Sequence, residues 1–214
     1  MSFEVEMLTV GPVAENCFLL RREGSDRLLV VDPGEEAERI LAAVQASGAK
    51  VEAILITHCH FDHIGAVAPV AAATGAPVYC PEIEVPVLAD IMSFVPWPGF
   101  GPFESYDADE VVRGGETLEL AGLELDVVFT PGHSPGHVTY AVRGEEALFS
   151  GDVLFQGSVG RVDLPGGDWP TLLASIGTLV EGHSAETVVH PGHMGLTTLG
   201  AERATNPFLA ELAR

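Results

Sequence analysis

The sequence has few basic residues. Lys50 is the single lysine, and lysine and arginine together number 10 against 31 acidic residues, which gives a formal net charge of −21 over 214 residues. A protein that grips a phosphate backbone needs a basic surface that displaces counterions. This balance therefore excludes nucleic acid as a partner and disfavours an anionic membrane surface. The acidity is typical of a solubility trait or of carboxylates that hold cations.

Cysteine is also scarce. The three cysteines, Cys17, Cys59 and Cys80, are an odd number in a chain that is 47% apolar. Such a chain can bury a core without a disulfide framework, and the odd count indicates reduced thiols and a cytoplasmic location. The first ten residues show neither the basic nor the apolar region of a secretory signal. Residues 64–81 carry no charge, but proline and glycine interrupt them, so we expect a buried helix there rather than a membrane span.

Alternating apolar patterns and turn residues predict strands in two groups. The first group covers residues 3–9, 17–20, 28–31, 51–57 and 78–80, and the second covers 118–120, 123–129, 138–142, 147–150 and 187–190. Helical spacing predicts helices at 35–46, within 64–81, and at 83–93, 169–180 and 201–213. Strands and then helices occur twice in this order, which predicts one α/β (α+β) domain over residues 1–214 with two similar halves.

A stretch rich in proline, glycine and aromatic residues, FVPWPGFGPFESY, covers residues 94–106. It has no strand or helix period, which is typical of a loop, yet its side chains are large and apolar. Two interpretations stand side by side. The rings either cap an edge of the core, or they form a wall of a cleft in which Trp97 and Phe100 contact a substrate.

Four polar clusters follow apolar, strand-forming runs: ILITHCHFDH, DVVFTPGH, ALFSGD and TVVHPGH. Side chains just beyond the ends of strands converge on one edge of an α/β fold. The clusters therefore bring together seven candidate metal ligands, His58, His60, Asp62, His63, His133, Asp152 and His193. Three imidazoles and a carboxylate within six residues would repel one another or stay unsatisfied without a cation.

The ligands divide into two open sites. We expect one ion on His58, His60 and His133, a second on Asp62, His63 and His193, and Asp152 between them, with two ions roughly 3.5–4 Å apart. Imidazole and carboxylate suit zinc, and the same set accepts iron or manganese. His137 competes with His133, but His133 ends its strand and closes the PGH turn that recurs at His193. We therefore expect His137 to support the ligands, and Cys59 to point away from them.

The motifs THCHFDHIG, TPGHSPGH and SGD resemble the signature set of the metallo-β-lactamase superfamily. The resemblance covers the whole chain and implies a four-layer αβ/βα sandwich with a metal site at one edge. Within the superfamily, LFSGDVLFQGSVGRVDLPGGD is most similar to glyoxalase II, the hydroxyacylglutathione hydrolases, and to their short bacterial relatives. The resemblance implies a single metallo-β-lactamase-like domain without a separate C-terminal helical substrate domain.

The glyoxalase resemblance implies a binuclear metallohydrolase that cleaves a small-molecule thioester, such as S-D-lactoylglutathione, by attack of a metal-bridging hydroxide. Asp62 and Asp152 would be its catalytic carboxylates, and two divalent ions, zinc first, its cofactors. A thiolate leaves without protonation because its acid has a pKa of about 8.5, so no general acid is required. The alternative is a persulfide dioxygenase that acts on glutathione persulfide with one iron.

Substrate recognition is less defined by the motifs. The larger glyoxalases carry a basic residue on the loop after the bridging aspartate, and Arg161 matches it in this chain. The resemblance therefore implies that Arg161 meets an anionic end of the substrate. A structural salt bridge from Arg161 to Asp163 is the competing interpretation. Two tyrosines of the larger glyoxalases fall at Asp163 and Gly195 in this chain. The thiol therefore stays open between glutathione, another small thiol and something unrelated, and the sequence does not predict the oligomeric state.

Overall fold

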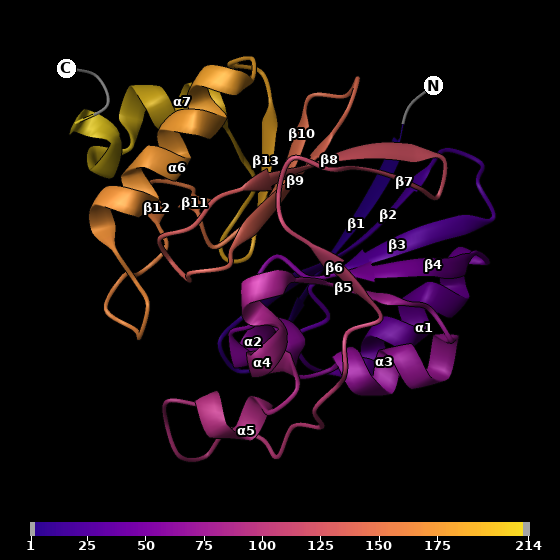
Figure 1. Ribbon diagram of the computed structural model, residues 1–214. Helices are drawn as coiled ribbons and strands as arrows, with labels where there is room; N and C mark the ends of the chain where they lie inside the picture. The colour runs from indigo at the N-terminus through magenta and orange to yellow at the C-terminus, as the bar shows by residue number, and fades with distance from the viewer. Residues whose placement is uncertain (1–2, 212–214) are drawn as a thin grey trace.

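Two six-stranded sheets lie face to face in the computed structural model of the chain, which describes residues 3–211 (Figure 1). The strand order is β1-β2-β3-β4-β5-β6 in the first sheet and β14-β13-β10-β9-β8-β7 in the second. A separate small hairpin joins β11 (Leu154–Phe155) and β12 (Ser158–Val159). The two sheets correspond to the two groups of strands that the sequence predicts.

The first sheet mixes antiparallel and parallel pairing. Its strands are β1 (Phe3–Val10), β2 (Glu15–Arg22), β3 (Arg27–Val31), β4 (Lys50–Leu55), β5 (Val78–Pro81) and β6 (Glu110–Val112). The first three pair antiparallel, whereas β3, β4, β5 and β6 pair parallel. Parallel neighbours need a crossover, and helices α1 (Ala37–Ser47), α2 (Phe61–Ile64) and α3 (Val67–Thr74) supply it.

The second sheet is antiparallel except for one pair. Its strands are β7 (Thr117–Leu120), β8 (Leu123–Phe129), β9 (Val138–Val142), β10 (Ala147–Gly151), β13 (Val188–Pro191) and β14 (Thr197–Thr198). The parallel pair is β10 and β13, which α6 (Trp169–Gly182) connects. Helix α7 (Leu199–Thr205) follows β14 and packs with α6 on the outer face of this sheet (Figure 1).

Alternate side chains of the central strands face opposite layers. In β3, Leu28 and Val30 pack toward α1 and α3, whereas Leu29 and Val31 pack toward the second sheet. A strand that is buried on both faces has no polar alternation, which explains the continuous apolar run of β3. Because each sheet also carries helices on its outer face, the architecture has four layers. The expected αβ/βα sandwich is confirmed.

The core between the sheets ends where the metal motifs begin. Tyr140 and Phe149 of the second sheet are fully buried in this core, and the Tyr140 hydroxyl donates to the Ile56 carbonyl at 2.9 Å. The bond ties β9 to the residue that follows β4. It links the two sheets at the edge that carries the predicted ligands.

The prediction of one continuous helix at 83–93 is wrong. Three short segments stand there instead, η1 (Glu82–Glu84), α4 (Val85–Leu88) and α5 (Ile91–Phe94). Asp90 leaves the helical conformation with φ −149° and ψ 59°, and the N–H of Ile91 donates to Ser105 Oγ at 3.1 Å. A side chain from a distant loop therefore replaces a helical carbonyl, a contact that spacing along the chain does not reveal.

Other boundaries moved by a few residues. Strand β4 ends at Leu55 rather than at 57, because the N–H of Thr57 donates to the Asp32 carboxylate instead of a neighbouring strand. The final helix is interrupted at Pro207 as expected, where η2 (Pro207–Glu211) begins, and its predicted last residues, 212–213, lie outside the described part of the chain. No helix among the described residues is long and apolar enough to cross a membrane.

Candidate metal centre and substrate cleft

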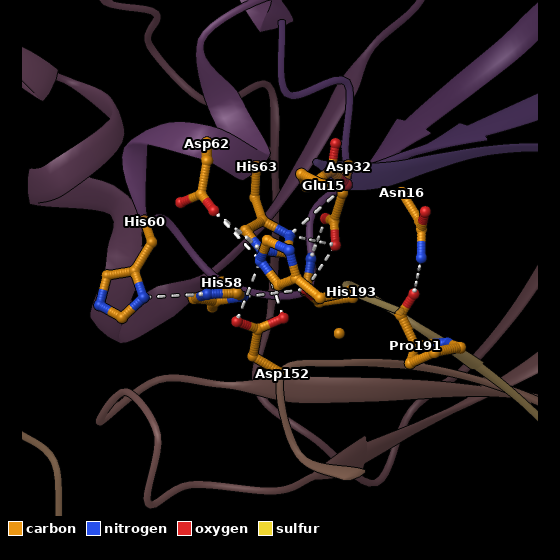
Figure 2. A network of polar contacts seen from close by, with 12 residues as sticks. Glu15, Asn16, Asp32, His58, His60, Asp62, His63, Asp152, Pro191 and His193 are labelled. Carbon is orange, nitrogen blue, oxygen red and sulfur yellow. Dashed lines mark hydrogen bonds and ion pairs between the residues drawn. The ribbon is translucent and has the colours of Figure 1, made fainter. Parts of the chain in front are cut away.

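The predicted ligands lie on loops at one edge of the two sheets. Residues 56–60 and the short helix α2 follow β4, and residues 130–137 follow β8. Asp152 follows β10, and His193 follows β13. Figure 2 shows Asp152 rising from the second sheet toward the imidazoles of the first. The structure therefore brings all seven predicted residues together.

Three histidines form the first ligand group. The ring nitrogens of His58, His60 and His133 lie within 4.8 Å of one another, and His58 Nε2 is 3.2 Å from His60 Nδ1. Burial and the neighbouring imidazoles lower the pKa of His58 well below its usual range and lower the pKa of His60 to about 3. Both rings are therefore neutral at physiological pH, which is the form that binds a metal.

Asp62, His63 and His193 form the second group, again with ligand atoms within 4.8 Å of one another. Asp62 Oδ2 is 3.2 Å from His193 Nε2 and 3.9 Å from His63 Nε2. Burial would raise the pKa of Asp62, but the hydrogen bond with His193 lowers it. Helix α2 begins at Phe61, so the first turn of this helix presents Asp62 and His63 to the same edge.

Asp152 lies between the two groups. Its Oδ1 is 3.3 Å from His63 Nε2, and its Oδ2 is 3.4 Å from His133 Nε2 and 3.6 Å from His193 Nε2. Burial opposes its ionisation, yet the surrounding imidazoles hold the pKa of Asp152 well below its usual range. One ionised carboxylate thus faces both groups.

Unpaired buried atoms test whether a cation fits here. His63 Nε2, His133 Nε2 and Asp152 Oδ1 are buried without a hydrogen-bond partner. Buried polar atoms are normally paired, and imidazole nitrogens and a carboxylate oxygen that stay unpaired around Asp152 are the ligand types that bind divalent cations. A Cβ at Gly192 would collide with Asp152 Oδ1 and would lie 2.6 Å from His63 Cε1. The donor set and the space around it fit divalent metal ions.

Asp32 orients His63, a role that was not predicted from the sequence. Its Oδ1 accepts from the Thr57 N–H at 2.7 Å, and its Oδ2 accepts from Thr57 Oγ1 at 2.6 Å and lies 3.1 Å from His63 Nδ1. A carboxylate on Nδ1 leaves Nε2 for the metal and fixes the ring. The signal was present, because Asp32 follows the apolar β3 just as the other site residues follow their strands.

Backbone carbonyls orient two further rings. His133 Nδ1 donates to the Arg161 carbonyl at 2.7 Å, and His193 Nδ1 donates to the Ala14 carbonyl at 3.2 Å. Both rings therefore keep Nε2 free for the metal edge. His137 Nε2 accepts from the Asp152 N–H at 3.1 Å. His137 supports a ligand from behind, as expected, and does not join the group.

The loop that carries His193 is bound to β2. Asn16 Nδ2 donates to the Pro191 carbonyl at 3.0 Å (Figure 2) and to the Met194 carbonyl at 2.9 Å, and the backbone of Glu15 forms an isolated antiparallel β-bridge with that of His193. Burial raises the pKa of Glu15 well above its usual range. Strand β2 therefore fixes the loop that carries His193, the last ligand along the chain. The contacts of Glu15 and Asn16 with this loop were not predicted from the sequence.

Glu84 joins two ligand loops and was also missed. One oxygen accepts from Ser134 Oγ and from the Gly136 N–H, each at 2.8 Å, and the other accepts from the Cys59 N–H at 3.3 Å. The Cys59 thiol points away from the ligands, as expected, with its Sγ 3.6 Å from Cys80 Sγ. The chain has many acidic residues, and Glu84 lies between apolar neighbours, so no pattern in the sequence distinguishes it from the others.

A cavity of about 600 Å³ opens between the ligands and the 94–106 segment. Trp97 lines it, with its ring centroid 6.3 Å from that of Phe61. Phe100 lies behind this wall, where its ring is 4.7 Å from Phe61 and packs against the core of the first half. The segment thus serves as a wall at Trp97 and as a core cap at Phe100.

Arg161 also lines the cavity. Its guanidinium lies 5.3 Å from the centre of the Trp97 ring, and its Nε and Nη2 donate to the two carboxylate oxygens of Asp163 at 2.6 and 2.8 Å. The salt bridge that competed with substrate binding in the sequence analysis is therefore present. A contact between Arg161 and a substrate stays a prediction.

Sequence comparisons match this chain along nearly its whole length. A profile described as the metallo-beta-lactamase superfamily matches residues 10–197. The chain is 39% identical to the probable metallo-hydrolase YqgX of Bacillus subtilis over 207 residues, which cover 94% of this chain and 95% of that protein. It is 31% identical to the hydroxyacylglutathione hydrolase GloC of Haemophilus influenzae over 212 residues, 96% of this chain and 97% of GloC.

Solved structures match the fold closely. The crystal structure of the BLEG-1 B3 metallo-beta-lactamase has a TM-score of 0.91 and 38% identity, covering 97% of this chain and 100% of that one. The crystal structure of TTHA1623 in a di-iron-bound form has a TM-score of 0.85 and 42% identity, covering 95% and 100%. Profile, sequence relatives, sandwich and metal edge agree, and the chain belongs to the metallo-β-lactamase superfamily of metallohydrolases.

Proposed function

We propose that this protein is a binuclear metal-dependent hydrolase that cleaves a small-molecule thioester, with S-D-lactoylglutathione as the first substrate to test. The observation that carries the proposal is the position of Asp152, whose two oxygens face the two ligand groups. A complete second group favours two ions over the single iron of a persulfide dioxygenase.

The ions would be held by His58, His60 and His133 on one side and by Asp62, His63 and His193 on the other, with Asp152 between them. When bound, they supply a water that ionises near neutral pH and a Lewis acid that polarises the carbonyl group of the thioester. Zinc suits this set of ligands, and iron or manganese fits the same set. The di-iron form of TTHA1623 supports a pair of ions in this fold.

The protein's own groups position the reaction. Asp62 lines the cavity with a lowered pKa, so its carboxylate is ionised and can hold a cation or accept a hydrogen bond from the attacking water. Asp32 and the Arg161 carbonyl hold His63 and His133 in the tautomer that keeps Nε2 toward the ions. Glu84 keeps the two ligand loops together. The ligands are therefore arranged before substrate binds.

A thioester suits this cleft better than an amide or an alkyl ester. The leaving thiolate needs no proton, because its conjugate acid has a pKa of about 8.5. The cleft then has to supply only orientation and apolar contact for the acyl and thiol portions. We expect Trp97 and Arg161 to supply these from the wall, and the contact predicted for Phe100 requires the substrate to reach behind Trp97. The name of GloC supports the same class of substrate.

The test combines metal analysis with activity. Purified protein is loaded with zinc, iron or manganese, the metal bound per chain is quantified, and hydrolysis of S-D-lactoylglutathione is followed. Two ions per chain and thioester hydrolysis that Asp152→Ala abolishes are the expected result. Oxygen uptake with glutathione persulfide and no thioester hydrolysis would replace the proposal with the dioxygenase. A β-lactam serves as a third substrate, since BLEG-1 is a B3 metallo-beta-lactamase.

A further inference from the structure

The mouth of the cleft is lined by exposed apolar side chains. Val13, Ile83, Phe94 and Trp97 all line the cavity, and 36%, 54%, 54% and 40% of their surface is exposed. They come from three separate stretches of the chain, so their meeting at one opening is a property of the fold. Large apolar side chains gathered around a single opening mark a site for an apolar ligand.

Charge at the mouth is neutralised. Among the described residues that line the cavity, Arg161 is the one with a permanent positive charge, and both of its donating nitrogens engage Asp163 in a two-pronged pair. The hydrogen bond from Arg161 lowers the pKa of Asp163 to about 2, so the pair stays ionised at any physiological pH. The side of Arg161 toward the cavity rests near the Trp97 ring.

An anionic thiol would have to share Arg161 with Asp163 in this arrangement. A glutathione thioester carries two carboxylates, and one that approached Arg161 would meet Asp163 beside it. In the described part of the chain, three carboxylates line the cavity: Asp62 and Asp152, whose charge would be offset by the ions they hold, and Glu84, which accepts hydrogen bonds from the ligand loops. The formal net charge of −21 adds a long-range repulsion. A neutral apolar thiol avoids these costs and covers the exposed rings.

We infer that this cleft selects neutral, apolar thioesters, and that Asp163 is a specificity-determining residue that disfavours anionic thiols by competing with them for Arg161. The inference rests on the proposed thioester hydrolysis and narrows it. It predicts that S-D-lactoylglutathione is hydrolysed, but with a lower kcat/KM than the corresponding thioester of a neutral thiol.

Four substrates separate charge from chain length: the lactoyl and hexanoyl thioesters of glutathione and of N-acetylcysteamine. We expect kcat/KM to be higher for the neutral thiol with either acyl group, and to rise about three- to fourfold for each acyl methylene that the cleft buries. Asp163→Asn frees Arg161 and should raise the ratio of anionic to neutral kcat/KM about two- to fivefold. Asp107→Asn makes the same charge change at an exposed position outside the cavity and should leave the ratio unchanged.

A binding measurement removes the dependence on catalysis. Trp97 and Trp169 are the two tryptophans, so Trp169→Phe leaves Trp97 as the one tryptophan, whose fluorescence is followed with excitation selective for tryptophan. The uncleavable thioethers S-hexylglutathione and S-hexyl-N-acetylcysteamine are titrated into this variant, and we expect tighter binding of the neutral compound. Tighter binding of the glutathione thioether, or a preference for glutathione thioesters that Asp163→Asn does not change, would overturn the inference. Selective binding of the neutral thioether without hydrolysis of any thioester would overturn only the proposed function.

Discussion

The Glu84 carboxylate accepts a hydrogen bond from the backbone N–H of Cys59 at 3.3 Å, and thereby holds the peptide between two candidate ligands. Its other oxygen accepts from Ser134 Oγ and the Gly136 N–H in the loop of His133. Both loops of the first ligand group therefore share one buried anchor. The anchor touches neither the ligand atoms nor the reacting atoms, so Glu84 is a positioning residue.

Loss of this anchor should loosen the metal. Glu84→Ala leaves two buried N–H groups unpaired, at a cost of about 1–3 kcal/mol each, and should weaken metal binding about tenfold or more. Glu84→Gln keeps one accepting oxygen and should recover part of the affinity. Glu82→Ala, in the same short turn but exposed and paired with Arg113, is the matched control. Competition with a chelator and thermal unfolding measure both effects, and an unchanged metal affinity in Glu84→Ala would refute the role.

Asp152 and His193 should differ in metal loss. Asp152 faces both groups, whereas His193 belongs to one. We expect Asp152→Ala to lose more metal per chain than His193→Ala, and both variants to lose hydrolysis. Metal content by mass spectrometry after gel filtration gives the comparison. Equal loss of a single ion in the two variants would mean that Asp152 does not bridge.

Asp32 should act on the second group through His63. In Asp32→Asn an amide replaces the carboxylate that faces His63 Nδ1, and we expect metal affinity at the second group to fall about 10- to 100-fold. The same substitution at the exposed Asp26 is the control. Stepwise metal titration distinguishes the two groups. If the first ion to leave comes from His58, His60 and His133, the assignment of Asp32 to the second group is incorrect.

Trp97 and Phe100 should separate binding from stability. Trp97 is 40% exposed in the cavity wall, so Trp97→Ala should lower kcat/KM about tenfold with nearly unchanged unfolding temperature and metal content. Phe100 packs against the core, so Phe100→Ala should destabilise the fold by about 2 kcal/mol. Kinetics and calorimetry on both variants decide the matter. A stability loss in Trp97→Ala with normal kinetics would return the whole segment to the core.

Removal of metal should destabilise the protein. Buried ligand atoms without partners regain water or a cation only when the edge opens. At metal concentrations a thousandfold above the dissociation constant, binding adds about 4 kcal/mol, which corresponds to roughly 8–16 °C in a chain of this size. Differential scanning calorimetry before chelation, after it and after metal is restored measures the shift. Chelation should lower the unfolding temperature of Asp152→Ala much less than that of the wild type. A wild-type shift of under one degree would mean that bound metal does not stabilise the fold.

The sequence predicted the ligands better than the groups that hold them. His58 and its partners follow strand ends, and that pattern is local and readable. Asp32 carries the same pattern after β3, but it lacks a second polar neighbour and resembles an ordinary turn residue. Glu84 had no signal, because its three donors come from loops that only the folded chain brings near.

The fold shows the same division. Strands β8 and β9 have the predicted bounds, since their patterns are long and bordered by turns. Strand β6 was missed because three residues at a sheet edge are too few for a period. The helix expected at 83–93 failed because Ser105, from a remote loop, caps α5 at Ile91. Contacts between distant residues decide these cases, and periodicity contains no information about them.

The hydrogen bonds between the His193 loop and β2 can form only late in the synthesis of the chain. The two acceptors of the Asn16 side chain, the carbonyls of Pro191 and Met194, lie 175 and 178 positions further along the chain. The ribosome adds roughly 5–20 residues per second, so His58, His60 and His63 are exposed for on the order of 10 s before the last ligand exists. Until then the second ligand group lacks His193. We therefore expect the second ion to be acquired only after the chain is complete, from the metal ions that are then free in the cell.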